Sequence, residues 1–137
     1  MRRFLVALSA ALMLCLPLTA CDGREFALRA AQTLDISYTA YDAAMKVAAD
    51  AHKSGRLDNA GRDRVIDAGQ IYIDAWRMGM NALIVYVDAQ SEENRGDVLK
   101  QLEAIRGRLN ELLTLAAALK LDVENIMGWE SKTPALE

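Results

Sequence analysis

The chain has few of the residues that build catalytic and metal sites. Its 137 residues contain one histidine, His52, and two cysteines, Cys15 and Cys21. A zinc site needs three or four nitrogen, sulfur or oxygen ligands, and no second histidine accompanies His52. The sequence also lacks the Cys-x-x-Cys-His motif of covalently bound haem and the Glu-x-x-His motif of di-iron bundles. We therefore expect no enzymatic activity, no cofactor and no metal site.

The remaining polar candidates have structural interpretations. His52 follows an apolar helical pattern, and we interpret it as an interfacial or capping histidine near a helix C-terminus, the alternative being a metal or haem ligand. A solvated acidic face, paired with nearby arginines, explains the recurring aspartates better than a metal site does. The aspartates are Asp35, Asp42, Asp50, Asp63, Asp67 and Asp74, and the arginines are Arg64, Arg77 and Arg106.

Proline is rare in the chain, and there is no excess of positive charge. The only prolines are Pro17 and Pro134, so nothing between residues 23 and 121 prevents long helices. The formal net charge is −3, which argues against a nucleic-acid partner, because neutralising phosphates requires clustered Lys and Arg. At 137 residues the chain is long enough for one domain with a modest core.

The N-terminus carries the most specific motif. Arg2 and Arg3 precede an apolar stretch from Phe4 to Leu18, which is too short for a membrane-spanning helix of roughly 20 residues. The string Leu18-Thr19-Ala20-Cys21 follows. This region resembles a bacterial lipoprotein signal peptide with its lipobox, in which small residues precede the cut and the next cysteine carries the lipid.

The resemblance implies a location and a covalent modification. Residues 1–20 would be removed, and Cys21 would carry a diacylglyceryl thioether and usually an N-acyl group such as palmitate. Two or more acyl chains give stable membrane anchoring. We expect a lipid-anchored protein of the bacterial cell envelope on the periplasmic side. Asp22 resembles the enterobacterial sorting signal that favours the inner membrane over the outer one.

The body predicts an all-α fold, an antiparallel up-down-up three-helix bundle with a short C-terminal fourth helix. Three segments carry alternating three- and four-residue apolar spacing, which favours shallow crossing angles. The first stripe is Leu34, Tyr38, Tyr41, Met45, Ala48 and His52. The second is Val65, Gly69, Tyr72, Trp76, Gly79, Leu83 and Tyr86. The third is Val98, Leu102, Ile105, Leu109, Leu112, Ala116 and Leu119.

Local signals set the predicted boundaries. Ser54-Gly55-Arg56 ends the first helix with Gly55 in a left-handed position, and Asp58 or Asn59 caps the second. The polar run from Gln90 to Gly96 predicts the next loop. The predicted division is a signal peptide (1–20), a lipidated tether (21–29) in which the first helix can begin, a three-helix bundle (30–121), and a short helix and tail (122–137). We expect Asp122 to cap a helix reaching Trp129, and residues 131–137 to form a loose tail.

Folding the chain at these breaks predicts which aromatic residues meet. Tyr41 should lie opposite Tyr72, and Tyr38 opposite Trp76. Core filling is the simpler interpretation of the aromatic residues, and a groove for a partner or a ligand is the alternative. The second helix is apolar around most of its girth, which leaves surplus apolar surface. This surface lies near Ile73, Met80, Ile84 and Val87. We expect it to be covered by the tail around Trp129, by a second copy of the chain or by another protein.

The leading functional hypothesis is a membrane-anchored lipoprotein that acts as a protein-interaction module, with an envelope protein or itself as partner. Small exported lipoproteins of this general kind include accessory subunits of envelope complexes and exclusion or lysis-control proteins of phages and prophages. The alternative is a bundle that binds a small apolar ligand or haem between its first two helices. The possible partner surface comprises Ile73, Met80, Ile84, Val87 and Trp129.

Overall fold

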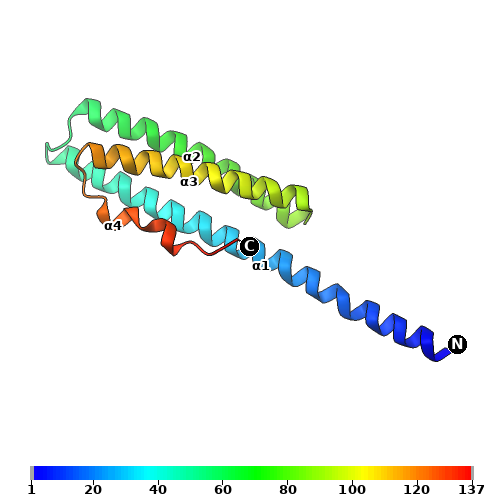
Figure 1. The fold of residues 1–137 in the computed structure, drawn as a ribbon. Helices are drawn as coiled ribbons and strands as arrows, with labels where there is room; N and C mark the ends of the chain where they lie inside the picture. The colour runs from blue at the N-terminus through cyan, green and yellow to red at the C-terminus, as the bar shows by residue number, and fades with distance from the viewer. Residues whose placement is uncertain (1, 137) are drawn as a thin grey trace.

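The protein is a bundle of three long helices. The computed structural model describes the backbone of residues 2–136 and the side chains of residues 22–136. Helices α1 (Arg2–Lys53), α2 (Asn59–Asp88) and α3 (Glu92–Ala118) lie side by side with alternating directions (Figure 1). The described residues contain no β-strand. The predicted up-down-up bundle is confirmed. The alternating helix directions follow from the short connections between successive helices.

The first connection is built from the residues that the sequence indicated. Gly55 adopts a positive φ of 73°, which ends α1 in the left-handed region that glycine tolerates best. The Asp58 carboxylate accepts a 2.7 Å hydrogen bond from the backbone N–H of Gly61 and so caps α2. The choice left open between Asp58 and Asn59 is therefore settled in favour of Asp58.

The second connection is shorter than predicted. The polar run from Gln90 to Gly96 was expected to be a loop, but α3 already begins at Glu92, where the Ser91 hydroxyl accepts a 3.1 Å bond from the Asn94 backbone N–H. Glu92 and Glu93 occupy the first turn, where negative charge is favourable near exposed backbone N–H groups. A polar first turn therefore resembled a loop in the sequence.

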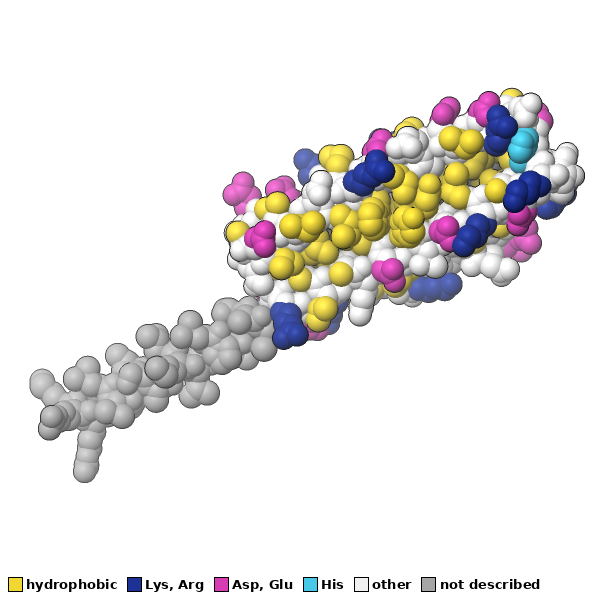
Figure 2. Space-filling view, turned by 180° about the vertical axis from the view of Figure 1, so that it is seen from behind, with side chains coloured by type: hydrophobic (Ala, Val, Ile, Leu, Met, Phe, Trp, Pro, Cys, Tyr) yellow, Lys and Arg dark blue, Asp and Glu magenta, His cyan; other side chains and the backbone are white. Residues whose placement is uncertain are grey.

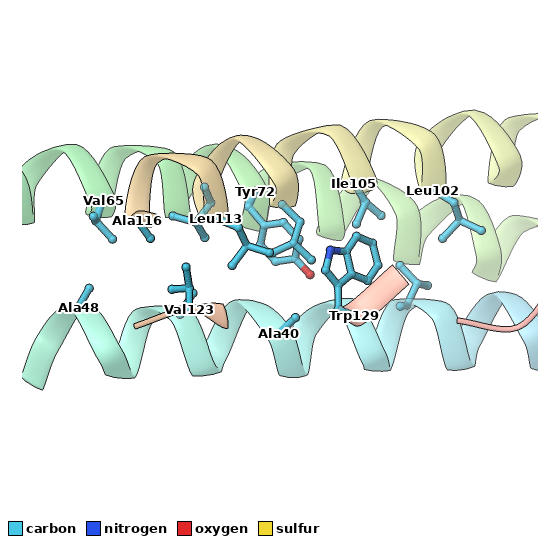
Figure 3. Packing of buried hydrophobic residues seen from close by; sticks show 14 of the residues in the cluster. Ala40, Ala48, Val65, Tyr72, Leu102, Ile105, Leu113, Ala116, Val123 and Trp129 are labelled. Atoms are coloured by element: carbon cyan, nitrogen blue, oxygen red, sulfur yellow. The ribbon is translucent and has the colours of Figure 1, made fainter. Parts of the chain in front are cut away.

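The core lies between the three helices, and its largest fully buried side chain is Tyr72 (Figure 3). The stripes predicted for α2 and α3 are mostly buried, whereas that of α1 is turned relative to the prediction. Tyr38 is 42% exposed, and Tyr41 and Met45 are only partly buried. The side of α1 that faces the core instead presents mainly small residues: Ala30, Leu34, Ser37, Ala40, Ala44, Ala48 and Ala51.

The segment expected to be a tether is helical from Asp22 onward and belongs to α1. Phe26 is buried there and packs edge-on against Tyr86, with ring centroids 4.9 Å apart. The Arg95 guanidinium lies 4.7 Å from the Phe26 ring centroid on the other side of this contact. The bundle therefore starts earlier than residue 30.

The C-terminal segment differs from the expected loose tail. Helix α4 (Glu124–Met127) is a single turn without a side-chain cap, so Asp122 does not cap it, and a 3-10 turn, η1 (Trp129–Lys132), follows. Residues 122–136, called here the C-terminal strap, run back along α1 and α3 (Figure 1). Two side chains of the strap itself, Val123 and Trp129, are buried.

Three polar contacts hold the strap at its middle and its far end. The Arg29 guanidinium donates a 2.9 Å hydrogen bond to the Ala135 carbonyl, and Leu136 packs against the core. The Glu130 carboxylate accepts from Arg106 at 2.8 Å and from Asn110 at 2.9 Å. A chain segment tied to α1 and α3 in this way covers the groove between those two helices and leaves a cavity of about 270 Å³ beside it.

Candidate functional site

An apolar groove runs between α1 and α2 on the face shown in Figure 2. There a continuous strip of hydrophobic side chains lies lengthwise between charged margins and extends toward the end that carries the histidine. We call this strip the open groove and define it by seven residues. They are Tyr38, Tyr41 and Met45 of α1, and Ile66, Ile73, Trp76 and Met80 of α2.

A ladder of aromatic rings leads from the core to the surface of this groove. Tyr72, which is fully buried, stacks on Tyr41 with centroids 4.8 Å apart and an interplanar angle of 17°. The Tyr38 ring lies 5.8 Å from that of Tyr41 and 5.3 Å from that of Trp76. The predicted pairs Tyr41–Tyr72 and Tyr38–Trp76 are both confirmed.

Two polar groups of this ladder form hydrogen bonds inside the bundle. The Tyr72 hydroxyl donates to Ser37 Oγ at 3.0 Å, and the Ser37 hydroxyl donates to the Leu34 carbonyl at 2.9 Å. The Trp76 indole N–H donates to the same carbonyl at 3.1 Å. These bonds fix the Tyr72 and Trp76 rings in place, so that their apolar faces contribute a rigid part of the ladder.

Burial also keeps the two inner tyrosines neutral. Burial raises the pKa of Tyr72 well above its usual range, with the bond from its hydroxyl to Ser37 acting in the opposite direction. Burial raises the pKa of Tyr41 as well, helped by Tyr38 and Asp42. A phenol with a raised pKa stays protonated at physiological pH, so neither Tyr41 nor Tyr72 is suited to act as a general base.

The open groove deepens near the α1–α2 connection into a cavity of about 310 Å³. Its lining residues are mainly apolar: Met45, Ala48, Ala49, His52, Lys53, Arg62, Val65 and Ile66. Gly69 allows α2 to approach Met45 of α1 closely, because a Cβ at position 69 would lie only 3.0 Å from Met45 Sδ. The volume lies at the lower end of the range for small-molecule sites.

His52 sits in this cavity wall with both ring nitrogens engaged. Nδ1 lies 3.0 Å from the Leu57 carbonyl, and Nε2 lies 3.4 Å from Arg62 Nη1. A guanidinium only donates, so Nε2 accepts and Nδ1–H donates to the carbonyl. The expected interfacial role at the helix C-terminus is confirmed, and the engaged lone pair disfavours a haem ligand.

The charged residues beside the groove are paired along their own helices. Asp42, four residues after Tyr38, bonds Lys46, and Arg77, four residues after Ile73, lies 3.5 Å from Asp74. Arg62 bonds its neighbour Asp63 at 2.7 Å. Local pairing leaves the margins of the groove without an excess of either sign.

One pairing expected from the sequence is wrong. Arg106 does not pair with an aspartate of the first two helices but with Glu130 of the strap. In residues 22–136, no group of three or more His, Cys, Asp or Glu side chains could hold a metal ion.

The residues of the sequence-predicted partner surface separate in the structure. Ile84 and Val87 are 54% and 53% exposed, while Ile73 and Met80 line the open groove. Trp129 is not part of this surface: it is 4% exposed, and its indole N–H donates to Asn110 Oδ1 of α3 at 3.2 Å. The strap therefore covers α1 and α3 and leaves α2 uncovered.

Ile66 was missed, although the sequence held a signal for it. Ile66, Ile73, Met80 and Val87 are spaced seven residues apart and form a second apolar seam, one residue displaced from the core seam of α2. Exposed Ile71, Met78 and Val85 also recur every seven residues on the opposite flank of the helix. Heptad spacing of this kind is typical of surfaces that pack against another helix at a shallow angle.

No family model, curated protein or solved structure matches the chain. Among the residues that the structure describes, no helix combines the length and the apolar composition that crossing a bilayer requires.

Proposed function

We propose that this protein is a lipid-anchored component of the bacterial cell envelope that works, without catalysing a reaction, by binding another protein chain in its open groove. The observation that carries the proposal is the contrast beside α1: the strap lies over the groove with α3, while the aromatic groove with α2 is left open. An exposed apolar strip with charged margins is typical of a protein-interaction surface.

The anchor in this proposal comes from the sequence. Cys21 is the acylation site and Asp22 the sorting residue, and the Cys21 side chain lies outside the described residues. Asp22 is exposed and stands 3.9 Å from Arg95 of α3. With acyl chains at Cys21, the bundle would begin directly at the periplasmic face of the inner membrane.

The chemistry of the groove supports binding over catalysis. The Trp76 indole N–H is committed to an internal bond, and both ring nitrogens of His52 are engaged. Tyrosine and tryptophan supply three of the seven residues of the open groove, and both residue types are enriched at interaction hot spots. An accessory subunit of an envelope complex and a phage-derived exclusion protein both fit such a module.

Two measurements on the full chain test the proposal. Metabolic labelling with palmitate should mark the wild type but not Cys21→Ala, and the labelled chain should remain in the membrane fraction. A photo-crosslinking amino acid at Tyr38 should capture a protein there. The same probe at Lys100, an exposed residue of α3, should not. An unlabelled wild type would refute the anchor, and equal capture from both positions would refute the groove.

The cavity beside His52 favours one second candidate, a site for a small apolar ligand. Solvent extraction of the purified protein, followed by mass spectrometry, should then recover one lipid-like molecule in stoichiometric amount. A Soret band would indicate haem. Ile66→Trp, which fills the cavity, should abolish retention of a small ligand.

A further inference from the structure

We propose that the cavity beside His52 binds a fatty acid, whose chain lies among the apolar lining residues and whose carboxylate meets Lys53 and Arg62. The inference rests on the second candidate function, because it names the class of ligand for the same cavity. It does not depend on the protein partner proposed for the open groove.

The first observation is the composition of the cavity wall. Five of its eight lining residues are apolar, and the other three, His52, Lys53 and Arg62, are all of the basic type. Within residues 22–136, no acidic side chain lines this cavity. Such a wall complements a ligand that is apolar over most of its length and negatively charged at one point.

The basic and the apolar lining residues are separated along the bundle. His52 and Lys53 are the last two residues of α1, and Arg62 lies near the start of α2, so all three lie beside the connection between these helices. In Figure 2 the histidine and basic side chains lie at this end of the apolar strip. The cavity follows α1 from Met45 to Lys53, a length of about 12 Å. A ligand therefore places its charged head at the connection and its chain toward Met45.

The basic side chains retain donors for a carboxylate. Arg62 donates through Nε and Nη2 to Asp63 and through Nη1 to His52, which uses three of the five N–H groups of a guanidinium. Two N–H groups, one on each terminal nitrogen, remain for a ligand. Asp63 offsets the charge of Arg62, so the exposed Lys53 supplies the net positive charge of the wall. Hydrogen bonds between charged partners of this kind are about twice as strong as neutral ones.

The apolar end of the cavity suits a flexible chain better than a rigid ring system. Ala48 and Ala49 line it with small side chains, and Met45 is unbranched and adapts to the shape of what it contacts. Ile66 lies on the outer side and is 49% exposed. A ligand chain that covers Ile66 removes apolar surface from water, which is the main source of affinity for such a ligand.

Photoaffinity labelling of the full chain in its membrane tests the proposal. The probe is a fatty acid with a diazirine in its chain, and irradiation should label the peptides that contain Met45 and Ile66. Lys53 lies about 48 Å along α1 from Cys21, so probe dissolved in the bilayer does not account for labelling there. Excess octanoate should suppress the label, whereas octanol and octylamine, which lack the negative charge, should not.

Substitutions separate the site of the head from that of the chain. Lys53→Gln should raise the octanoate concentration needed for suppression about tenfold, because one charge-assisted contact is lost. Lys100→Gln, the same change at an exposed residue of α3, should leave that concentration unchanged. Ile66→Trp fills the cavity and should abolish the label. Circular dichroism of each variant establishes that the bundle remains helical, so that a lost label is not a lost fold.

The outcomes separate the inference from the function on which it rests. Suppression by octanol as effective as that by octanoate would overturn the anionic ligand and leave a neutral one, so the second candidate function would stand. Equal effects of Lys53→Gln and Lys100→Gln would also overturn the inference alone. Absence of label from the cavity peptides, or label that persists in Ile66→Trp, would refute the cavity as a ligand site altogether. Protein capture by the Tyr38 probe is measured separately and survives each of these results.

Discussion

Helix α1 borders two grooves, and the C-terminal strap covers only one of them. On the α3 side, Trp129 of the strap is buried and bonded to Asn110, and Glu130 is bonded to Arg106. On the α2 side, Trp76 is bonded to the Leu34 carbonyl, but Tyr38 above it remains 42% exposed. Both grooves satisfy an indole N–H, so the difference between them lies in cover rather than in internal chemistry.

The contacts in the covered groove indicate what kind of partner the open groove requires. The strap contributes two large buried side chains, Val123 and Trp129, and burying such side chains is worth roughly 1.5–3 kcal/mol each. Polar contacts at Arg29 and Arg106 then hold it in register. A partner for the open groove should likewise supply apolar side chains first and tolerate a nearly neutral margin.

The largest expected effect comes from uncovering the filled groove. Trp129→Ala removes the buried anchor of the strap and should lower the free energy of unfolding by about 3 kcal/mol. Urea denaturation followed by circular dichroism measures this loss. Truncation of the partly exposed Tyr38 to alanine provides the matched change on the open side. Equal losses for the two variants would show that the grooves do not differ in the way described.

Two glycines of α2 allow the covered core and the open groove to be compared by adding a single methyl group at each position. A Cβ at Gly79 would lie 2.5 Å from Ile105 Cδ1 and 3.3 Å from Leu34 Cδ2, inside the core. Gly79→Ala should therefore destabilise the bundle by about 1–2 kcal/mol, the overpacking cost exceeding the gain in helix propensity.

The counterpart at Gly69 faces the open groove. There a Cβ would lie 3.0 Å from Met45 Sδ, and Met45 borders a cavity into which it can move. Gly69→Ala should be neutral or stabilising by up to about 1 kcal/mol, because alanine favours the helix. Thermal unfolding of both variants gives the comparison, and a larger loss at Gly69 than at Gly79 would contradict it.

The sequence predicted the fold where the signals are local. Gly55 and Asp58 shape the first connection through their own backbone and side-chain preferences, so they were identifiable without a structure. The aromatic pairs of the candidate site followed from folding the chain at that connection. Polar residues at the start of α3 misled, since a helix start and a loop share a preference for Ser and Glu.

The exposure of the site could not be predicted in the same way. Tyr38 and Ala44 both lie within helical apolar patterns, and only contacts with α3 and the strap decide which side of α1 is buried. The strap itself depends on pairs distant in sequence, such as Arg106 with Glu130 and Asn110 with Trp129. The sequence carried no local signal for these pairs, so residues 131–137 were predicted to be a loose tail and the short helix before them was not placed against α3.

In the open groove, truncation of Tyr38 should weaken partner binding more than it lowers stability. Tyr38→Ala removes two aromatic contacts, each worth about 0.5–1.5 kcal/mol in favourable geometry, from a partly exposed ring. We expect a loss of about 1 kcal/mol in unfolding free energy but a clear loss of protein capture by a photo-crosslinking amino acid placed at Ile66, another residue of the open groove. Denaturation and crosslinking yield are measured on the same preparation. Unchanged crosslinking would exclude Tyr38 from the interface.

The smallest expected effect concerns the ion pair that fastens the strap. Hydrogen bonds from Arg106 and then from Asn110 lower the pKa of Glu130. A carboxylate with a lowered pKa stabilises the folded state above the usual glutamate pKa of about 4.3. This contribution is lost as the pH falls through the lowered value. Glu130→Gln should therefore be slightly less stable than wild type at pH 7 and lose less stability on acidification.

Because this pair is largely solvent-exposed, its contribution should be small and should shrink with added salt. A double-mutant cycle between Arg106→Ala and Glu130→Gln, measured by denaturation at pH 7 in low and in high salt, isolates the coupling. A coupling that is unchanged in high salt would show that charge is not what holds the strap at this point. Burial of Trp129 would then account for nearly all of the difference between the two grooves.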